Sequence, residues 1–287
     1  MTDNPRTYPH GVPCWIDLET PDMDASLAFY EQLFGWSLAS RTPPESPGRY
    51  VVASTDGTDA TAVAAIATPG DGAASPGAEA VWNTYLAVDD VDAAAARVAE
   101  LGGTAEPAET VGPPGAAAGR IARIRDPHGA ESRLWQAGTR LGAQRVNGPG
   151  TWNFSNLNTP DVDASLRFYG PLLGWEVDPQ RAAGMARVPG YGDHLARTSD
   201  PGIYERQAGF APEGFADAVA GIGFADGPAS WSVVFAVADR DAAAEAARDA
   251  GGAVVATAEN DWARGAVLRD PQGAEFEISQ FAPRGSR

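Results

Sequence analysis

The arrangement of apolar and polar positions predicts strands and capped helices in a regular order. Residues 14–19 alternate in the manner of a short, half-buried strand. Thr20 or Asp22 can cap the helix that follows, because either side chain can accept a hydrogen bond from the first backbone N–H groups of a helix. Gly35 is expected to end that helix, since glycine adopts the left-handed conformation of a helix C-terminus without strain.

The same order of elements continues through the first half of the chain. A strand at residues 82–88 leads into an alanine-rich helix at residues 91–101, which Gly102 and Gly103 end. A last strand at residues 130–135 follows a turn. This half is therefore predicted to contain the unit β-α-β-β-β twice.

Two motifs recur in the second half and define an internal repeat. TPDMDASLAFY at residues 20–30 recurs as TPDVDASLRFY at residues 159–169, and a Leu-x-Gly-Trp sequence follows each copy. DPHGAE at residues 126–131 recurs as DPQGAE at residues 270–275. The repeat covers nearly the whole chain, so the second half is predicted to have the same elements as the first.

The length agrees with two domains, since 287 residues at roughly 150 per domain leave room for two cores. Glycine and proline cluster between the two copies of the repeat. We expect a first domain at residues 1–138, a linker at residues 139–149 and a second domain at residues 150–287.

Composition excludes several classes of chemistry. The 21 basic residues against 38 acidic ones give a net charge of −17, which disfavours nucleic acids and anionic membranes as partners. All 21 basic residues are arginine, so chemistry that needs a lysine amine is excluded. Cys14 is the only cysteine of the sequence, which excludes an internal disulfide and multi-cysteine metal sites. No apolar stretch is long enough to cross a bilayer and the first residues do not resemble a signal peptide, so we expect a cytoplasmic protein.

These motifs resemble the vicinal oxygen chelate superfamily, which includes glyoxalase I, extradiol dioxygenases and the bleomycin- and fosfomycin-resistance proteins. The resemblance rests on the Asp-capped helix that ends Phe-Tyr and Leu-x-Gly-Trp, and on the late Asp-Pro-x-Gly turn. The layout is most similar to two-domain actinobacterial proteins of the CFP-30B-like type. The resemblance implies an α+β fold of two tandem domains, each made of two βαβββ modules that curl around a cavity.

The resemblance also implies positions for a divalent metal, and these positions hold unsuitable residues. They are occupied by Trp15, Asn83 and Arg133 in the first repeat. In the second repeat they are occupied by Phe154, Ser232 and Glu277. Glu277 alone is a competent ligand, because an arginine stays protonated and repels a cation. We therefore expect no cofactor and no metal ligands, although a divalent metal stays open as an alternative.

The face that carries these positions lines the cavity in the superfamily, and its polar residues are the candidate site. We assign acid–base roles to Glu277, Asp17 and Tyr85. The ligand-binding residues are expected to be Trp15, Asn83, Arg123, Arg133, Phe154, Asn156 and Ser232. Comparison of the two repeats favours the pocket with Arg133 as the more functional one, for an anionic or carbonyl-bearing ligand. Two structural alternatives stay open: an Asp17–Arg133 ion pair that fills the cavity, and a Glu277 that is a remnant of a lost metal site.

Two classes of function follow. The first is an enzyme of this superfamily that acts on a small oxygenated metabolite with a carbonyl, enol or carboxylate group, through acid–base chemistry. The second is a non-catalytic protein that sequesters a drug or reactive metabolite. A metal-dependent lyase or dioxygenase is a weaker third alternative, because the metal ligands are missing. The expected partner is a small molecule, and the two repeats are expected to pack as an intramolecular pseudo-dimer in a monomer or homodimer.

Overall fold

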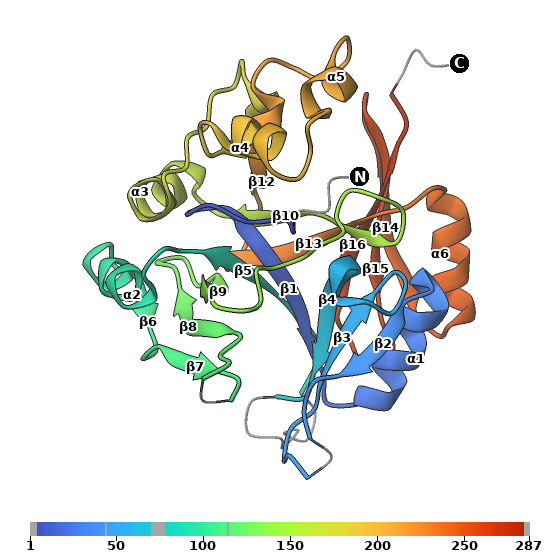
Figure 1. The fold of residues 1–287 in the computed structure, drawn as a ribbon. Helices are drawn as coiled ribbons and strands as arrows, with labels where there is room; N and C mark the ends of the chain where they lie inside the picture. Colours follow the sequence, from blue (N-terminus) through green and yellow to red (C-terminus); the bar gives the residue numbers. More distant parts are fainter. Residues whose placement is uncertain (1–4, 44, 70–77, 114, 284–287) are drawn as a thin grey trace. The chain divides into compact units, whose positions relative to one another are not determined.

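The computed structural model describes residues 5–43, 45–69, 78–113 and 115–283 (Figure 1). The first repeat contains β1 (Pro13–Glu19), α1 (Met23–Phe34), β2 (Ser37–Ser40), β3 (Tyr50–Ser54), η1 (Asp59–Thr61), β4 (Ala62–Ala67), β5 (Val81–Ala87), α2 (Val91–Glu100), β6 (Thr104–Ala105), β7 (Glu109–Val111), β8 (Gly119–Arg125) and β9 (Glu131–Ala137). The second repeat contains β10 (Thr151–Thr159), α3 (Val162–Leu173), η2 (Ala182–Gly184), β11 (Ala186–Arg187), α4 (Tyr191–Arg197), α5 (Ile203–Gln207), η3 (Phe215–Asp217), β12 (Ala218–Phe224), β13 (Ser230–Ala236), α6 (Arg240–Asp249), β14 (Ala253–Glu259), β15 (Ala263–Arg269) and β16 (Glu275–Phe281).

Each repeat builds one mixed sheet. In the first repeat the strand order is β2-β3-β4-β1-β5-β9-β8-β6, with β7 also paired to β8. In the second repeat the order is β11-β12-β10-β13-β16-β15-β14. The first strand of a module pairs in parallel with its last strand, as β5 does with β9 and β13 with β16. A parallel pair needs a crossover connection, and the helix of each module supplies it.

The described residues form two compact units, and each unit takes segments from both repeats. The first compact unit comprises residues 1–15, 84–142 and 155–231. The second comprises residues 16–83, 143–154 and 232–287. Each unit thus joins the second half of one repeat to the first half of the other. The predicted domain boundaries at residues 138 and 150 describe the sequence repeat and stay a prediction.

The first compact unit is built around helices α2 and α3, which lie side by side (Figure 1). Leu134 and Leu157 are fully buried in its core together with the aromatic residues of α3. The Tyr169 hydroxyl donates a hydrogen bond to Asp126 Oδ2 at 3.1 Å. The Trp175 indole N–H donates to the carbonyl of Gly11 at 2.7 Å. The repeated aromatic residues therefore belong to the core, and their polar atoms are satisfied inside it.

The second compact unit has the corresponding arrangement around helices α1 and α6, which also lie side by side (Figure 1). Tyr30 is fully buried, and its hydroxyl donates to Asp270 Oδ2 at 3.0 Å. The Phe34 ring packs against the Phe235 ring in a tilted arrangement, with ring centroids 4.8 Å apart. The aromatic cluster of this unit consists of Phe29, Tyr30, Phe34, Trp36, Trp82, Phe235 and Phe276.

The predicted helix ends are confirmed in both repeats. Asp22 caps α1, because its side chain accepts the backbone N–H of Ala25 at 3.1 Å. Thr20 instead hydrogen-bonds Ser26 Oγ, so Asp22 is the cap of the two alternatives. Gly35 ends α1 in the left-handed conformation, with φ of 69°.

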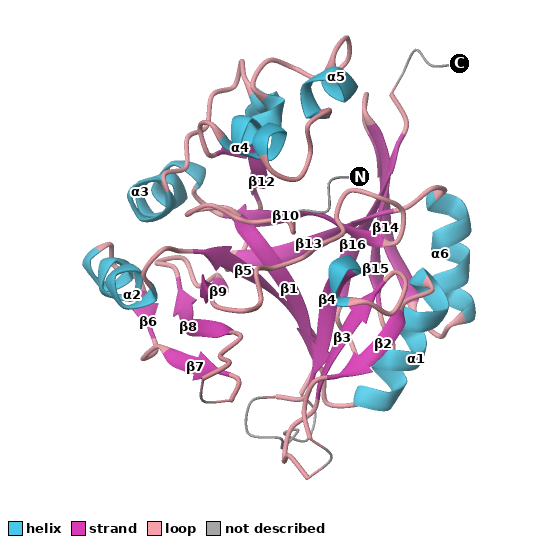
Figure 2. Ribbon diagram, in the orientation of Figure 1, coloured by secondary structure: helices cyan, strands magenta, loops and turns pink. Residues whose placement is uncertain are grey.

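The predicted three strands after the helix are wrong for the third module. Between α3 and β12 the chain forms one strand, the two-residue β11, together with the helices α4 and α5 (Figure 2) and the 3₁₀ helices η2 and η3. Tyr191 and Leu195 are four residues apart on α4 and both are buried, which is helical periodicity rather than strand alternation. His194 also lies on α4, and its Nε2 lies 2.9 Å from Thr7 Oγ1.

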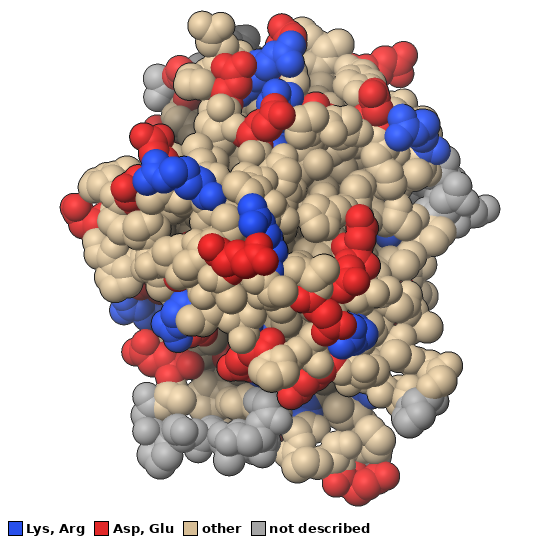
Figure 3. All heavy atoms as spheres, turned by 90° about the vertical axis from the view of Figure 1, so that its left-hand side faces the viewer, with Lys and Arg blue, Asp and Glu red and all other residues tan. Residues whose placement is uncertain are grey.

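Basic and acidic side chains are interspersed on the face of the molecule in Figure 3. Many of the described arginines contact a nearby carboxylate, for example Arg269 with Glu275 at 2.6 Å. Such exposed pairs contribute about 0–1 kcal/mol each. These pairs neutralise individual arginines, so the arginines do not form a basic patch on this face. No helix of the described residues is long and apolar enough to span a membrane.

Candidate functional site

The ten candidate residues divide equally between the two compact units. The first unit contains Trp15, Tyr85, Arg123, Arg133 and Asn156. The second unit contains Asp17, Asn83, Phe154, Ser232 and Glu277.

In the first unit, Tyr85, Arg123 and Arg133 share one face of the sheet. Tyr85 of β5 lies opposite Arg133 of β9, which in turn lies opposite Arg123 of β8. The Trp135 ring, two residues further along β9, meets the Tyr85 ring edge to face with centroids 6.1 Å apart. We call these four residues the Arg133 face.

The Arg133 face is filled by its own side chains. Arg133 is 3% exposed and Tyr85 is 7% exposed. The Arg123 side chain is more accessible, and its guanidinium lies 4.0 Å from the carboxylate of Glu106. A ligand would therefore have to displace protein side chains before it could reach the Arg133 guanidinium.

Trp15 is buried beneath a cation. The Arg140 guanidinium lies 5.7 Å from the centre of the Trp15 ring, within the range of a cation–π interaction. The Trp135 indole N–H donates to the Arg140 carbonyl at 3.2 Å. This hydrogen bond holds the backbone of Arg140 in place. The sequence offered no signal for this contact, because Arg140 falls in the predicted linker.

Asn156 of β10 is half-buried and owes its place to a glycine on the neighbouring strand. Gly221 of β12 is its partner in the register. A Cβ atom at residue 221 would lie 2.1 Å from Asn156 Oδ1, so only glycine leaves room for this amide.

In the second unit, Asp17 and Asn83 form a buried pair. Asn83 Nδ2 donates to Asp17 Oδ1 at 3.0 Å, and both residues are less than 5% exposed. The amide satisfies one oxygen of the carboxylate in the core. Phe154, on β10 of the same unit, is half-buried.

The second unit also brings Ser232 and Glu277 together, on strands β13 and β16. Ser232 Oγ donates to Glu277 Oε1 at 2.6 Å. Both residues are half-buried, so the carboxylate is held by a defined partner and is still reached from outside. The residues that share this face in the strand register are Val234, Val267, Gly265 and Ser279, and we call the six together the Glu277 face.

The two faces occupy equivalent positions of the repeat and differ in bulk. Counting from the repeated Asp-Pro-x-Gly turn, Glu277 corresponds to Arg133, Val267 to Arg123 and Ser279 to Trp135. Val234 corresponds to Tyr85 by the parallel strand pairs. At these four positions the first repeat has large side chains, whereas the second repeat has one carboxylate and three smaller side chains. The Glu277 face therefore combines an ionisable group with smaller neighbouring side chains than the Arg133 face has.

The residues at the implied metal positions do not fit a divalent metal. Trp15 and Arg133 have no lone pair to offer, and Phe154 has no polar atom. Glu277 is a single carboxylate and is already hydrogen-bonded to Ser232. Within the described part of the chain, no three His, Cys, Asp or Glu side chains are grouped so that they could hold a metal ion.

Two tyrosine–aspartate pairs join the repeated motifs, and these pairs were not predicted from the sequence. Tyr30 donates to Asp270, and Tyr169 donates to Asp126. Asp270 also accepts the backbone N–H groups of Gln272 and Ala274, so it fixes the hairpin turn. Burial raises the pKa of Asp270 above its usual value and raises the pKa of Tyr30 well above that of a free phenol. The signal was present in the sequence as the co-occurrence of Phe-Tyr and Asp-Pro-x-Gly in both repeats.

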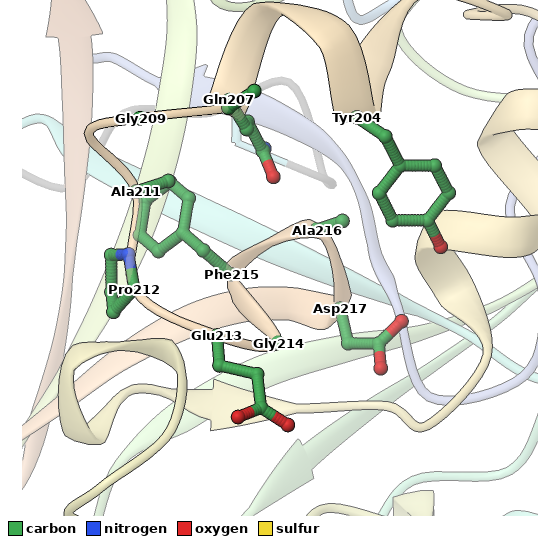
Figure 4. Close-up of a pocket in the computed structure, with 11 residues that line it drawn as sticks. Tyr204, Gln207, Gly209, Ala211, Pro212, Glu213, Gly214, Phe215, Ala216 and Asp217 are labelled. Carbon is green, nitrogen blue, oxygen red and sulfur yellow. The ribbon is translucent and has the colours of Figure 1, made fainter.

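A hollow of about 270 Å³ lies beside α5 and η3 in the first unit, lined by residues between Tyr204 and Asp217 (Figure 4). The polar side chains of Tyr204, Glu213 and Asp217, which line it, are engaged with the protein. Asp217 accepts the backbone N–H of Gly192 at 2.8 Å, and Tyr204 donates to Asp193 at 2.8 Å. Glu213 pairs with Arg181. This hollow contains none of the ten candidate residues.

Comparisons with known proteins agree with this architecture. The profile of the Glyoxalase/Bleomycin resistance protein/Dioxygenase superfamily matches residues 14–134, and that of the Glyoxalase-like domain matches residues 155–279. The chain is 38% identical over 280 residues to a Mycobacterium tuberculosis protein named "Putative glyoxylase CFP32", covering 96% of this chain and 97% of the relative. It is 34% identical over 281 residues to the anthracycline biosynthesis protein DnrV of Streptomyces peucetius, covering 94% of each.

Solved structures share the fold at low sequence identity. The Mn(II)-bound glyoxalase from Novosphingobium aromaticivorans has a TM-score of 0.58 at 16% identity, over 94% of this chain and 82% of that one. The 2,3-dioxygenase LapB from Pseudomonas sp. KL28 has a TM-score of 0.58 at 14% identity, over 97% and 96% of the two chains. The predicted fold class is confirmed. The chain belongs to the glyoxalase/bleomycin resistance protein/dioxygenase superfamily, in which it carries two tandem domains of the glyoxalase type.

Proposed function

We propose that this protein binds a small carbonyl- or enol-bearing metabolite on the Glu277 face and catalyses proton transfer there without a metal. The observation that carries the proposal is the 2.6 Å hydrogen bond between Ser232 and Glu277 on a face where the equivalent bulky residues of the first repeat are small. A carboxylate held in this way is oriented to accept a proton from a ligand.

The chemistry that fits is the movement of a proton next to a carbonyl group. Glu277 takes the proton from the carbon beside the carbonyl, and the electron pair of the broken C–H bond moves into an enolate. Glu277 then returns the proton to the enolate, at the same or at a neighbouring atom. The step is balanced without an oxidant, a reductant or a metal, and it belongs to isomerases and lyases.

The names of the relatives support a small organic ligand. One relative is named as a glyoxylase and another as an anthracycline biosynthesis protein. Both names place those proteins in the chemistry of small organic molecules. We propose the same class of partner for this chain, and a cytoplasmic site of action that cell fractionation would test.

A second candidate function is sequestration without turnover, and the Arg133 face favours it. There Arg133 shares one face of the sheet with Tyr85 and Trp135, whose rings are in contact. Arginine stays protonated at ordinary pH, so the guanidinium could bind an anionic ligand but could not accept a proton from it. The burial of Arg133 makes this the weaker candidate.

The matched positions of the two repeats allow a direct test. The wild-type protein would be incubated in D₂O with a panel of 1,3-dicarbonyl compounds and α-hydroxyketones, and deuterium uptake at carbon would be followed by NMR. Binding would be measured in parallel by tryptophan fluorescence. We expect Glu277→Gln to reduce the exchange rate of a bound compound about 100-fold or more, the usual contribution of a general base.

The control is Arg133→Met, the equivalent position in the first repeat, which should leave exchange on the Glu277 face within about twofold. Unchanged exchange in Glu277→Gln would contradict the proposal. Loss of binding in a folded Arg133→Met, with binding intact in Glu277→Gln, would favour sequestration on the Arg133 face.

The metal-free part of the proposal has its own test. Elemental analysis of the purified protein should find well under one equivalent of Mn, Fe, Ni, Co or Zn, and proton exchange should survive strong chelators. The reason is the donor set, in which Glu277 is the only competent ligand among the six implied positions. A stoichiometric metal whose removal abolishes exchange would restore the metal-dependent lyase or dioxygenase alternative.

A further inference from the structure

Strand β14 forms an open edge of the second sheet. It is the last strand in the order of that sheet, and within the described residues it pairs with β15 alone. Six of its seven residues are exposed, and Val254 is half-buried. One row of backbone N–H and C=O groups of β14 is therefore available for pairing with another strand.

The side chains of residues 253–258 of β14 give this edge no protection. Residues 253–258 read AVVATA, without a charge or a proline. Val254, Val255 and Thr257 are β-branched, which favours the extended conformation. Val255 is 46% exposed although it is a large apolar residue. Proteins usually guard such an edge with charges, proline or a short strand.

The equivalent edge of the first repeat is guarded in each of these ways. The pairing of β14 with β15, and of β6 and β7 with β8, aligns residues 253–259 with residues 104–110. That stretch reads TAEPAET, and Pro107 separates the short strands β6 and β7. Glu106 corresponds to Val255 and Glu109 to Ala258. The second repeat therefore has apolar residues at each position where the first repeat has a proline or a carboxylate.

A second copy of this chain matches the edge better than an unrelated partner does. A two-fold axis pairs two β14 strands antiparallel, so the Glu259 end of one copy meets the Ala253 end of the other. The charges near both ends of β14 are paired within one copy: Arg269, opposite Ala253, contacts Glu275, and Glu259 contacts Arg264. Each end of the edge is therefore locally neutral and does not repel the end that it meets on a second copy. The uncharged centre also lets two chains of net charge −17 approach each other.

We propose that β14 is a docking edge for a second copy of this chain, which pairs with it antiparallel to extend the second sheet across a two-fold dimer. The register of β14 shifts between Val254 and Ala256, and this bulge shortens the stretch that can pair flat. Two strands of this length bury less surface than a standard stable interface. The dimer should therefore be weak and should form in a concentration-dependent manner.

The test is sedimentation velocity on the full chain over a wide range of concentration. The wild type should shift from monomer to dimer as its concentration rises. Val255→Glu, which copies Glu106 of the guarded edge, should stay monomeric at concentrations where the wild type is dimeric. Glu106→Gln at the equivalent position of the first repeat is the matched control and should dimerise like the wild type. Circular dichroism melting would show that each variant is folded.

A cysteine scan makes the result independent of the charge substitution. Single cysteines at residues 254–258 of β14 should include at least one that forms a disulfide-linked dimer on mild oxidation, because a residue near a two-fold axis meets its own copy. Cys14 is buried, so the wild type should not cross-link. A wild type that is monomeric throughout, or a Val255→Glu variant that dimerises like the wild type, would overturn the proposal.

Discussion

The Tyr30–Asp270 hydrogen bond links a residue of the first repeat to a residue of the second repeat within the core of one compact unit. Tyr30 Oη donates to Asp270 and accepts the indole N–H of Trp82 at 2.9 Å. Removing the hydroxyl leaves a buried carboxylate oxygen and a buried N–H without this partner, and such groups are costly in a core.

We therefore predict that Tyr30→Phe lowers the free energy of unfolding by about 1.5–3 kcal/mol, the usual contribution of a hydrogen bond to a charged group. Urea denaturation measures this loss. Tyr169→Phe removes the equivalent bond to Asp126 in the first unit and is the matched variant. An unchanged free energy of unfolding in both variants would show that the pairs add nothing to stability.

The same residue predicts a pH dependence. Burial raises the pKa of Asp270 and the bond from Tyr30 lowers it, with burial the larger effect. Because the pKa is higher in the folded state, the stability from protonated Asp270 is complete below the unfolded pKa of about 3.9 and is lost as pH rises through the folded pKa. Tyr30→Phe raises that folded pKa further, since the carboxylate loses a donor. The destabilisation by Tyr30→Phe should therefore be larger at pH 7 than at pH 4, and the reverse order would contradict this.

At the scale of elements, the sequence predicted those features that depend on residues close together in the chain, such as the ends of helices. The ends of α1 and α3 follow from an aspartate cap and a terminal glycine, so both helices were predicted close to their observed bounds. The strands of the third module were predicted from the repeat alone, and that symmetry fails where Tyr191 and Leu195 give the chain a helical period. The two sheet edges differ because of a local residue. Pro107 interrupts the edge of the first sheet, so β6 is only two residues long, whereas β14 has no proline and continues for seven residues.

The site was predicted where the repeat carried it and missed where tertiary contacts decide. Ser232 and Glu277 were both named from their positions in the motifs, and they form one hydrogen bond. The cover of Trp15 by Arg140 could not be read from the sequence, because the contact depends on how a loop returns to the sheet. The difference in bulk between the two faces needed the strand register, which is set by pairing partners far along the chain.

At the scale of the whole molecule, the compact units explain why the two halves of the chain need each other. The second unit joins residues of the first repeat to residues 232–287 of the second. Phe34 and Trp36 of the first repeat contact Phe235 of the second. Trp36 also donates its indole N–H to the carbonyl of Gly150 at 2.7 Å. Neither half can complete this aromatic cluster alone.

Residues 1–138 expressed alone should therefore aggregate or pair with themselves, because the aromatic side chains of α1 lose the surface that covers them. Co-expression with residues 139–287 should restore a non-covalent complex that elutes at the size of the intact chain in size-exclusion chromatography and unfolds in one transition. Phe235→Asp in the second fragment should prevent this rescue, because it places a charge against Phe34 and Trp36. A first fragment that is monomeric and folded on its own would show that each repeat is a self-sufficient domain, and the interlocked arrangement would then contribute nothing to folding.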